Sequence, residues 1–271
     1  MGINLENAVA IITGASSGIG KEAALEFARK GVRLSLAARR EAKLNEVADA
    51  VRELGSEALV VPTDVSLKTQ VDALVKKTLE HYGGRIDILL NNAGYGQLST
   101  IEETSAKEMK DILAVNYMGT YYATAAVLPH MKQRGSGHII NISSVAGARG
   151  FPLMGAYCVT KAAQRSLTEA LRIELDGTGV HASVVCPVFT ETEFFDAIKN
   201  KTDASVDPPS FLTQTAARVA KAIVKCAENP KPEVLPFPLA RVLIALNAIS
   251  PSLVDFILKR YYKSFLGRKI T

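Results

Sequence analysis

Short apolar runs alternate with longer stretches of helical spacing through most of the chain. The runs that we expect to form strands lie near Val9–Thr13, Val32–Ala37, Ala58–Thr63, Ile86–Asn91, His138–Ile142 and Val180–Cys186. The stretches between them place apolar residues three or four positions apart, which is typical of helices with one buried face. The alternation predicts an α/β fold: a doubly wound parallel sheet, covered by helices on both faces, that binds ligands at the carboxyl ends of its strands.

Residues 231–271 do not continue this alternation, and we expect a helical extension there. The run 242–249 is apolar on nearly every side, and Ser250 followed by Pro251 has the pattern of an N-cap with proline at the first helical position. The apolar face of the helix that follows would consist of Leu253, Phe256, Ile257 and Tyr261. We therefore expect a single domain over residues 1–230 and an apolar, basic extension over residues 231–271 that packs on it.

The extension carries the positive charge of the chain. It holds seven basic and two acidic residues, a net charge of +5, which equals the formal net charge of the whole chain at pH 7. Because the charge is confined to this segment and no nucleic-acid reading motif accompanies it, the sequence argues against a nucleic-acid partner. A basic amphipathic segment can bind an anionic membrane surface. The same pattern also suits an arm that packs on a second subunit or covers a pocket, so both interpretations stay open.

Composition and cysteine content indicate which class of protein and which cellular compartment to expect. A chain of 271 residues with 48% apolar content can bury a large core. No run approaches the roughly 18 apolar residues of a membrane span, and the first residues lack the basic and apolar regions of a signal peptide. The three cysteines, Cys158, Cys186 and Cys226, are odd in number and lack metal spacing. We therefore expect reduced thiols and no metal site in a cytoplasmic protein, with membrane association through the extension left open.

Tyr157 and Lys161 are four residues apart within one helical stretch. Residues at this spacing lie on the same face of a helix, so the phenol and the ammonium can meet at one reacting centre. The pKa of a free tyrosine is about 10, and a fixed cation beside the phenol favours the phenolate. The pair could therefore act as an acid/base, although the same spacing also occurs on an ordinary helix surface where the lysine reaches solvent.

A glycine-rich turn follows the first apolar run and precedes a helical stretch. Its sequence is Thr13-Gly14-Ala15-Ser16-Ser17-Gly18-Ile19-Gly20. Glycines in such a turn let the backbone approach a pyrophosphate, and the helix N-terminus offers free N–H groups and the positive end of a dipole. The arrangement predicts a phosphate-binding site, with an ordinary tight turn as the alternative.

Together these motifs resemble the short-chain dehydrogenase/reductase family. Besides the Gly-x-x-x-Gly-x-Gly turn and Tyr157-x-x-x-Lys161, the chain contains Asn91-Asn92-Ala93-Gly94, Asn116 and Ser144 in the order of that family. The resemblance covers about residues 6 to 200. It implies a Rossmann-type dinucleotide-binding and catalytic domain over residues 1–230. It also implies an oxidoreductase that interconverts a carbonyl and an alcohol by hydride transfer.

The resemblance favours NADP(H) over NAD(H) as the cofactor. Where NAD-selective relatives carry an acid after the second strand, this chain has Arg39 and Arg40, whose guanidinium groups suit a 2′-phosphate. Either arginine could instead begin the next helix at the surface, and NADP-using relatives often carry a basic residue where this chain has Ser17. The cofactor contacts that the family pattern implies are Gly14, Ser16, Ser17, Gly18, Ile19, Gly20, Arg39, Arg40, Asp64, Val65, Asn91, Ala93, Gly94, Tyr157, Lys161, Pro187, Thr190 and Thr192.

Val188 departs from the family's pattern. The family usually has glycine after the proline that corresponds to Pro187, and valine does not adopt positive φ cheaply. We therefore expect a different backbone there, and the nicotinamide contact implied for Thr192 is the least secure of the set.

The family pattern gives a task to each of four side chains, Asn116, Ser144, Tyr157 and Lys161. Ser144 would hydrogen-bond the substrate oxygen, and Tyr157 would give a proton to a carbonyl or take one from an alcohol. Lys161 would bind the nicotinamide ribose and lower the pKa of Tyr157. Asn116 would hold a water that connects Lys161 to solvent.

Apolar residues in the segments expected to flank the nicotinamide indicate a small or lipophilic substrate, although such residues also form cores and subunit interfaces. They are Val145, Phe151, Leu153, Met154, Phe189, Phe194, Phe195 and Phe211. A 3-oxoacyl carrier-protein reductase is the alternative enzyme, and a catalytically silent dinucleotide-sensing or scaffold protein is the alternative of another class.

Helices near residues 105–130 and 157–176 resemble the family's usual subunit interface, which implies a homodimer or homotetramer. Light scattering that showed only a monomer would contradict this.

Overall fold

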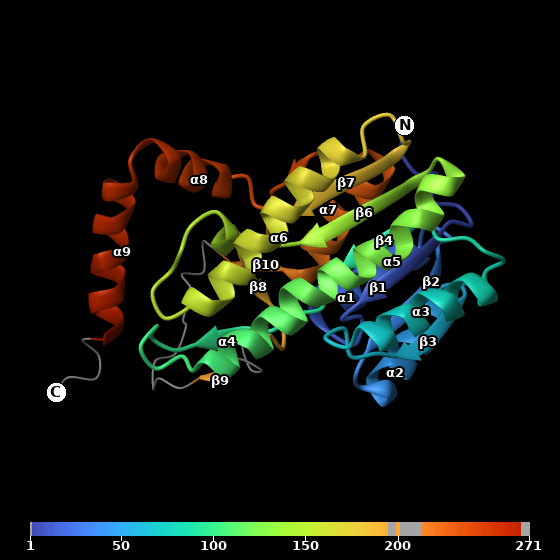
Figure 1. The fold of residues 1–271 in the computed structure, drawn as a ribbon, viewed down its shortest axis with the longest axis horizontal. Helices are drawn as coiled ribbons and strands as arrows, with labels where there is room; N and C mark the ends of the chain where they lie inside the picture. The colour runs from blue at the N-terminus through green and yellow to red at the C-terminus, as the bar shows by residue number, and fades with distance from the viewer. Residues whose placement is uncertain (1, 195–198, 201–212, 267–271) are drawn as a thin grey trace.

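A seven-stranded parallel sheet forms the centre of the protein in the computed structural model, which describes residues 2–194, 199–200 and 213–266 (Figure 1). The strand order is β11-β7-β6-β4-β1-β2-β3, and all neighbouring strands run parallel. The strands are β1 (Val9–Thr13), β2 (Arg33–Ala38), β3 (Ala58–Pro62), β4 (Ile88–Asn91), β6 (Gly137–Ile142), β7 (Val180–Val185) and β11 (Glu233–Val234). Six of them coincide with the predicted runs, and the predicted Rossmann-type α/β fold is confirmed.

Helices cover both faces of the sheet (Figure 1). One face carries α1 (Gly18–Ala28), α2 (Glu41–Glu53) and α7 (Ala216–Glu228), and the other carries α3 (Lys68–His81), α5 (Gly119–Arg134) and α6 (Gly155–Glu174). Successive residues of β1 alternate between the two cores: Ala10 and Ile12 belong to the first, and Ile11 belongs to the second. Because both faces are covered, β1 is buried along its whole length, and four of its five residues, Val9 to Ile12, form an apolar run.

The edge strand β11 is the strand of this sheet that sequence patterning misses. It pairs with β7 through Glu233 opposite Val184 and Val234 opposite Val185. A strand of two residues contains no apolar run from which it could be predicted. Since β11 lies within residues 231–271, the sheet includes the beginning of the segment that we assigned to the extension, and the helices of the extension begin after it.

Shorter elements surround the carboxyl ends of the strands. A helix of eight residues, α4, continues into a π-helical turn, and the turn leads directly into α5. Single π turns inside helices are frequent at functional sites, and this one contains the predicted Asn116. These elements are α4 (Ala106–Leu113), the π turn Ala114–Met118, the 3-10 turn Val145–Gly147, β5 (Gln97–Leu98), β8 (Phe189–Glu191), β9 (Lys199–Asn200) and β10 (Thr213–Thr215).

The last two helices, α8 (Ala240–Ile249) and α9 (Pro251–Leu266), form an arm on the side toward which the strands point (Figure 1). α9 begins at Pro251, as predicted. Arg149 ties the arm to the segment after β6, because it donates to Asn247 Oδ1 at 3.0 Å and forms an ion pair with Asp255. Within the described residues, no single helix is long and apolar enough to cross a membrane. Residues 240–249 and 251–260 reach that length and composition as a pair bent by 119°.

Candidate active site

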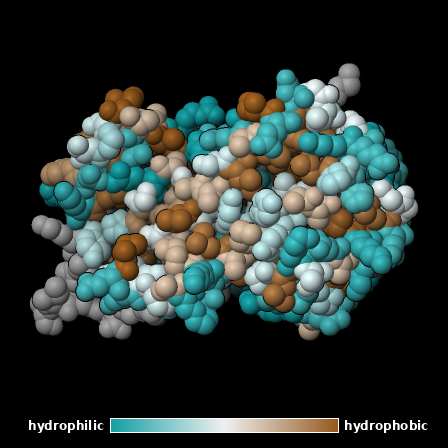
Figure 2. Space-filling view, viewed as in Figure 1, coloured by the Kyte–Doolittle hydropathy of each residue, from teal (hydrophilic) through white to brown (hydrophobic). Residues whose placement is uncertain are grey.

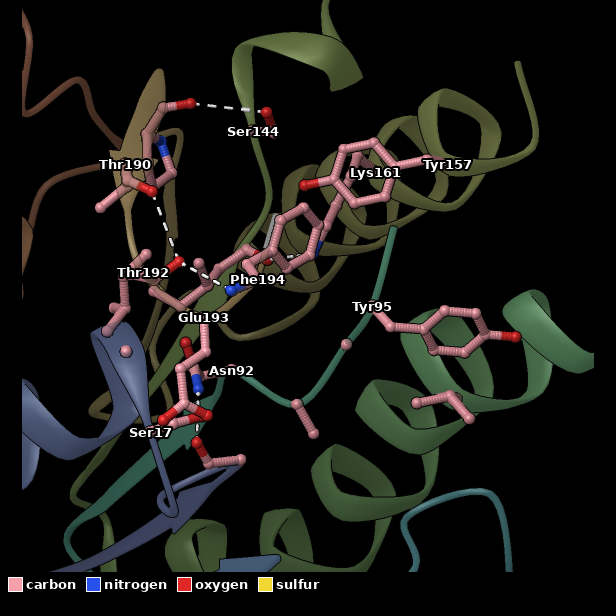
Figure 3. Close-up of a pocket in the computed structure, with 18 of the residues that line it drawn as sticks. Ser17, Asn92, Tyr95, Ser144, Tyr157, Lys161, Thr190, Thr192, Glu193 and Phe194 are labelled. Atoms are coloured by element: carbon pink, nitrogen blue, oxygen red, sulfur yellow. Dashed lines mark hydrogen bonds between the residues drawn. The ribbon is translucent and has the colours of Figure 1, made fainter. Parts of the chain in front are cut away.

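A cavity of about 390 Å³ lies at the carboxyl ends of the strands, where the strand order reverses around β1 (Figure 3). It brings together most of the residues predicted to bind a cofactor or to act in catalysis. The predicted residues that line it are Gly14, Ser16, Ser17, Gly18, Ile19, Arg39, Arg40, Asp64, Val65, Ala93, Gly94, Ser144, Tyr157, Lys161, Pro187, Thr190 and Thr192. The other three, Gly20, Asn91 and Asn116, are buried and do not line it.

The glycine turn forms one end of the cavity. Gly14 and Gly18 have φ angles of +66° and +54°, a region that favours glycine. A Cβ on Gly14 would lie 2.8 Å from Ala93 Cα, and a Cβ on Gly20 would lie 2.2 Å from the carbonyl oxygen of Gly14. The turn is therefore packed tightly, and the N-terminus of α1 borders the cavity, a position that suits a phosphate group.

Asn92 lines the cavity, whereas Asn91, one of the predicted cofactor contacts, does not. The amide of Asn91 points into the sheet and donates to Thr124 Oγ1 at 3.1 Å and to Asn141 Oδ1 at 2.8 Å. Asn92 lines the cavity and donates to the carbonyl oxygens of Thr13 and Gly14, each at 3.1 Å. Asn92 thus fixes the glycine turn against the end of β4. Asn92 was predictable from its position, because the first residue after a strand is free to turn toward the ligand edge.

Arg40 is the centre of a polar cluster beside the glycine turn. Its Nη2 donates to Ser17 Oγ at 2.9 Å and to Ser16 Oγ at 3.3 Å, and its Nη1 donates to Glu193 Oε2 at 3.2 Å. Lys43 Nζ donates to Glu193 Oε1 at 2.9 Å. The hydrogen bonds from Lys43 and Arg40 lower the pKa of the Glu193 carboxyl. Two cations therefore hold one anionic group at this end of the cavity.

Lys43 and Glu193 were not among the site residues predicted from the sequence. Lys43 stands one helical turn after Arg40 at the start of α2, so helical spacing could have indicated it. Glu193 lies 153 positions from Arg40, and no local signal connects the two.

Tyr157 and Lys161 project from α6 into the opposite end of the cavity (Figure 3). Lys161 Nζ lies 5.6 Å from the centroid of the Tyr157 ring. It donates to the carbonyl oxygen of Ile142 at 2.8 Å and to Gln164 Oε1 at 2.9 Å. The helix therefore brings the phenol and the ammonium together, as their spacing predicts, and the end of β6 and the next turn of α6 hold the ammonium.

Ser144 follows β6 and caps the 3-10 turn. Its Oγ accepts the N–H of Ala146 at 3.1 Å and donates to the carbonyl oxygen of Pro187 at 3.4 Å (Figure 3). The long second bond leaves the hydroxyl able to turn toward a ligand in the cavity. Ser143 is turned away, since its hydroxyl donates to the carbonyl oxygen of Lys161 at 2.7 Å.

Burial controls the protonation of the Tyr157–Lys161 pair. It raises the pKa of Tyr157 well above the ordinary value, while the nearby Ser144 hydroxyl acts in the opposite direction. It lowers the pKa of Lys161 to about 8. We expected Lys161 to lower the pKa of Tyr157, but here desolvation of the phenol is the larger effect, and the ammonium donates to Ile142 and Gln164 instead.

Asn116 and Gln164 form a buried polar network behind this pair. Asn116 Nδ2 donates to the carbonyl oxygen of Tyr95 at 2.9 Å and to Thr160 Oγ1 at 3.1 Å. Gln164 connects the two sides, because its Nε2 donates to the carbonyl oxygen of Asn116 at 2.7 Å while its Oε1 accepts from Lys161. Sequence reasoning did not include Gln164, although its position three residues after Lys161 on α6 could have indicated it.

Apolar side chains cover the tyrosine end of the cavity. Those that were predicted and line it are Val145, Phe151, Met154, Phe189 and Phe194. The rings of Phe194 and Tyr157 have centroids 5.7 Å apart. Leu153 does not line the cavity, and Phe195 and Phe211 lie outside the described residues. Val188 lines the cavity, and its φ angle is not positive. Among the described residues other than glycine, positive φ angles occur at Asn7 and Leu153.

The two ends of the cavity thus have different chemistry. One end suits phosphate groups, because it contains the glycine turn, the helix N-terminus and the Arg40 cluster. The Glu193 carboxylate is an anion that already accepts hydrogen bonds from donors at this end. The other end offers a phenol, an ammonium and a hydroxyl within an apolar wall. The residues therefore fit a dinucleotide that extends from one end to the other. Among the described residues, no group of three or more His, Cys, Asp and Glu side chains could hold a metal ion.

Comparisons with known proteins agree with this geometry. The sequence profile described as short chain dehydrogenase matches residues 8–203. An 11-beta-hydroxysteroid dehydrogenase-like protein of Arabidopsis thaliana is 40% identical over 252 residues, which cover 91% of this chain and 82% of that protein. The ketoacyl reductase HetN of Nostoc sp. is 34% identical over 262 residues, which cover 94% of this chain and 88% of that protein.

Two solved structures have the same fold. A Burkholderia phymatum short chain dehydrogenase/reductase in complex with NAD superposes with a TM-score of 0.84 at 31% sequence identity. The superposed part is 93% of this chain and 96% of the Burkholderia chain. A Thermococcus sibiricus alcohol dehydrogenase complexed with 5-hydroxy-NADP superposes with a TM-score of 0.75 at 30% identity and covers 85% of this chain and 96% of its own.

Proposed function

The chain belongs to the short-chain dehydrogenase family of oxidoreductases, and from this premise we propose that it interconverts a carbonyl and an alcohol on a small or lipophilic substrate with NADP(H). The observation that carries the proposal is one cavity with anion-binding groups at one end and Ser144, Tyr157 and Lys161 at the other. A dinucleotide laid along this cavity would bring its nicotinamide to the tyrosine end. The chemistry would then take place at the apolar wall.

NADPH would supply the hydride when bound, and the side chains would position the substrate and move the proton. Ser144 would hydrogen-bond the substrate oxygen, and Tyr157 would protonate that oxygen as negative charge develops on it. The phenolate left on Tyr157 would be stabilised by Lys161, which Ile142 and Gln164 hold in place. Gln164 would keep the lysine oriented, and Asn116 would hold a water through which the replacement proton reaches it.

We propose NADP(H) because Arg40, Ser16 and Ser17 converge at the glycine end of the cavity. The two structural neighbours were solved with different cofactors, so the preference rests on these side chains. Arg40→Leu should lower kcat/KM for NADPH by roughly 10- to 100-fold, which is the usual cost of a lost hydrogen bond to a charged group. The value for NADH should change less than about threefold, because NADH has no 2′-phosphate.

Loss of nicotinamide absorbance with NADPH and, separately, NADH measures this prediction. Arg29→Leu, which removes a cation at the far end of α1, is the matched control and should leave both values unchanged. Equal losses with the two cofactors in Arg40→Leu would contradict the preference for NADP(H).

The substrate class follows from the wall of the cavity and from the relatives. The same assay over ketones, aldehydes and 3-oxoacyl thioesters would separate a carbonyl reductase of lipophilic compounds from a 3-oxoacyl reductase, the alternative that the similarity to HetN favours. NADPH binding without turnover of any of them would favour the silent sensing role.

The predicted homodimer or homotetramer stays a prediction. Such an interface would bury Tyr121 and Val159, which are 45% and 50% exposed on α5 and α6.

We also propose that the α8–α9 arm rests on an anionic membrane surface. Among the described residues of the arm, the exposed charged side chains, Arg241, Lys259 and Arg260, are all basic, while Asp255 pairs with Arg149. Figure 2 shows apolar and polar side chains next to each other on this arm. The exposed large apolar side chains of this region are Leu239, Val242, Leu243, Ile249, Leu253, Phe256 and Ile257. Apolar side chains flanked by cations suit an anionic bilayer, whereas a second copy of the arm would bring like charges together.

Flotation of the full chain with phosphatidylcholine vesicles, with and without phosphatidylserine, tests the membrane contact. Binding should require the anionic lipid, and the double substitution Phe256→Asp with Ile257→Asp should weaken it at least about tenfold. Leu67→Asp is the matched control, since Leu67 is 48% exposed and lies outside both the arm and the predicted subunit interface. An absence of binding, or an equal loss in the control, would contradict the proposal. Dimerisation lost in the double variant would instead identify the arm as a subunit contact.

A further inference from the structure

We infer that Glu193 is a specificity-determining residue whose carboxylate competes with the 2′-phosphate of the cofactor for Arg40 and Lys43. The inference rests on the cofactor preference proposed above and adds to it a residue that opposes that preference. It starts from the polar cluster at the glycine end of the cavity, where Glu193 accepts hydrogen bonds from both cations.

The contacts of Glu193 are those that a phosphate would need. Arg40 directs Nη1 to Glu193 Oε2 at 3.2 Å, and Lys43 Nζ lies 2.9 Å from Glu193 Oε1. The second terminal nitrogen of Arg40, Nη2, lies 2.9 Å from Ser17 Oγ. Carboxylate and phosphate oxygens accept the same charge-assisted hydrogen bonds from these cations. A 2′-phosphate that engages Arg40 must therefore displace Glu193 or share the guanidinium with it.

The exposure of the cluster sets the size of this competition. The side chains of Arg40, Lys43 and Glu193 are 48%, 41% and 50% exposed. Ion pairs between such side chains are weak, because water and salt screen them. A phosphate with nearly two negative charges can displace the carboxylate, so Glu193 should reduce the affinity for NADP(H) without preventing binding. NAD(H), which lacks the 2′-phosphate, does not have to displace it.

Binding of two small nucleotides to the full chain isolates this effect from catalysis. Adenosine 2′,5′-bisphosphate and adenosine 5′-monophosphate differ only in the 2′-phosphate. By isothermal titration calorimetry, Glu193→Gln should bind the bisphosphate roughly three- to tenfold more tightly than the unmodified protein does, as expected for removal of an exposed competing charge. Its affinity for the monophosphate should stay the same. The gain should shrink as salt is raised.

Glu191→Gln is the matched control. Glu191 is exposed two residues earlier in the same segment, and no ion pair of the described residues includes it. Its substitution removes the same charge without freeing Arg40 or Lys43. An equal gain in this control, or a Glu193→Gln protein that binds both nucleotides as the unmodified protein does, would overturn the inference.

The same titrations separate this inference from the cofactor proposal. Tighter binding of the bisphosphate than of the monophosphate to the unmodified protein, lost in Arg40→Leu, would support NADP(H) whatever Glu193→Gln does. If the unmodified protein binds the two nucleotides equally and Glu193→Gln does not restore a preference, both the cofactor proposal and the competition are overturned.

Discussion

Replacing Tyr157 with phenylalanine should lower kcat by about 10²- to 10⁴-fold, the usual contribution of a positioned acid/base. The substitution removes the one hydroxyl that we assign to proton transfer. It keeps the ring, whose centroid lies 5.7 Å from that of Phe194 and 5.6 Å from Lys161 Nζ. The packing of α6 and the affinity for NADPH should therefore be preserved. Turnover, an NADPH binding titration and a thermal melt on the same preparation would separate lost chemistry from lost structure.

Tyr95 provides the control for this prediction. It also lines the cavity, so Tyr95→Phe removes a second phenol from the same site. We expect kcat to change less than about tenfold there, because the hydroxyl of Tyr95 has no part in the proposed proton transfer. Turnover by Tyr157→Phe within tenfold of the unmodified protein would remove the tyrosine from its assigned role. A larger loss in Tyr95→Phe would move that role to Tyr95.

The fold was predictable because its central strands are buried on both faces. A strand such as β1 is then mostly apolar, and the run from Val9 to Ile12 that precedes Thr13 is visible in the sequence. The edge strand β11 has no such requirement. It is two residues long and half-buried, and its pairing with β7 depends on where α7 delivers the chain. Nothing in the residues themselves distinguishes it from a loop.

The site was predictable where neighbours in sequence are neighbours in space. The glycine turn and the Tyr157–Lys161 pair each belong to one local element, so their spacing carries the geometry. Asn91 was predicted as a cofactor contact from the family's pattern, whereas the side chain that lines the cavity is that of Asn92, because the direction in which the chain turns after β4 is not visible in the sequence. Glu193 reaches Arg40 from another part of the chain, and that contact exists only once the sheet has formed.

The pKa values of Tyr157 and Lys161 could not be predicted from the sequence either. Local spacing places a cation beside Tyr157 and suggests a lowered pKa. Whether the phenol is also desolvated depends on the residues that pack over it, including Phe194, which is distant in sequence. In the folded protein burial raises the pKa of Tyr157 and lowers that of Lys161. The phenolate is therefore best stabilised during the reaction itself, when charge develops beside the lysine.

Replacing Lys161 with methionine should lower kcat by about 10²- to 10³-fold, the usual cost of removing one preorganised donor from a reacting centre. Methionine is similar in length but carries no charge and cannot donate. Ile142 O and Gln164 Oε1 would then lose the donor that now lies 2.8 Å and 2.9 Å away. A kcat within tenfold of that of the unmodified protein would show that the ammonium does not act on the phenol.

The same variant should change how stability depends on pH. Burial lowers the pKa of Lys161 from its ordinary 10.5 to about 8. Between these two values the lysine is protonated in the unfolded chain and neutral in the folded one, so the unfolded state binds more protons and the free energy of unfolding rises with pH. Relative to Lys161→Met, the unmodified protein should gain up to about 3 kcal/mol across this window. Urea unfolding at a series of pH values measures the difference, with Lys21→Met as the exposed-lysine control. A difference that stays constant across the window would mean that Lys161 keeps its proton in the folded protein, and that its charge is better solvated than its burial implies.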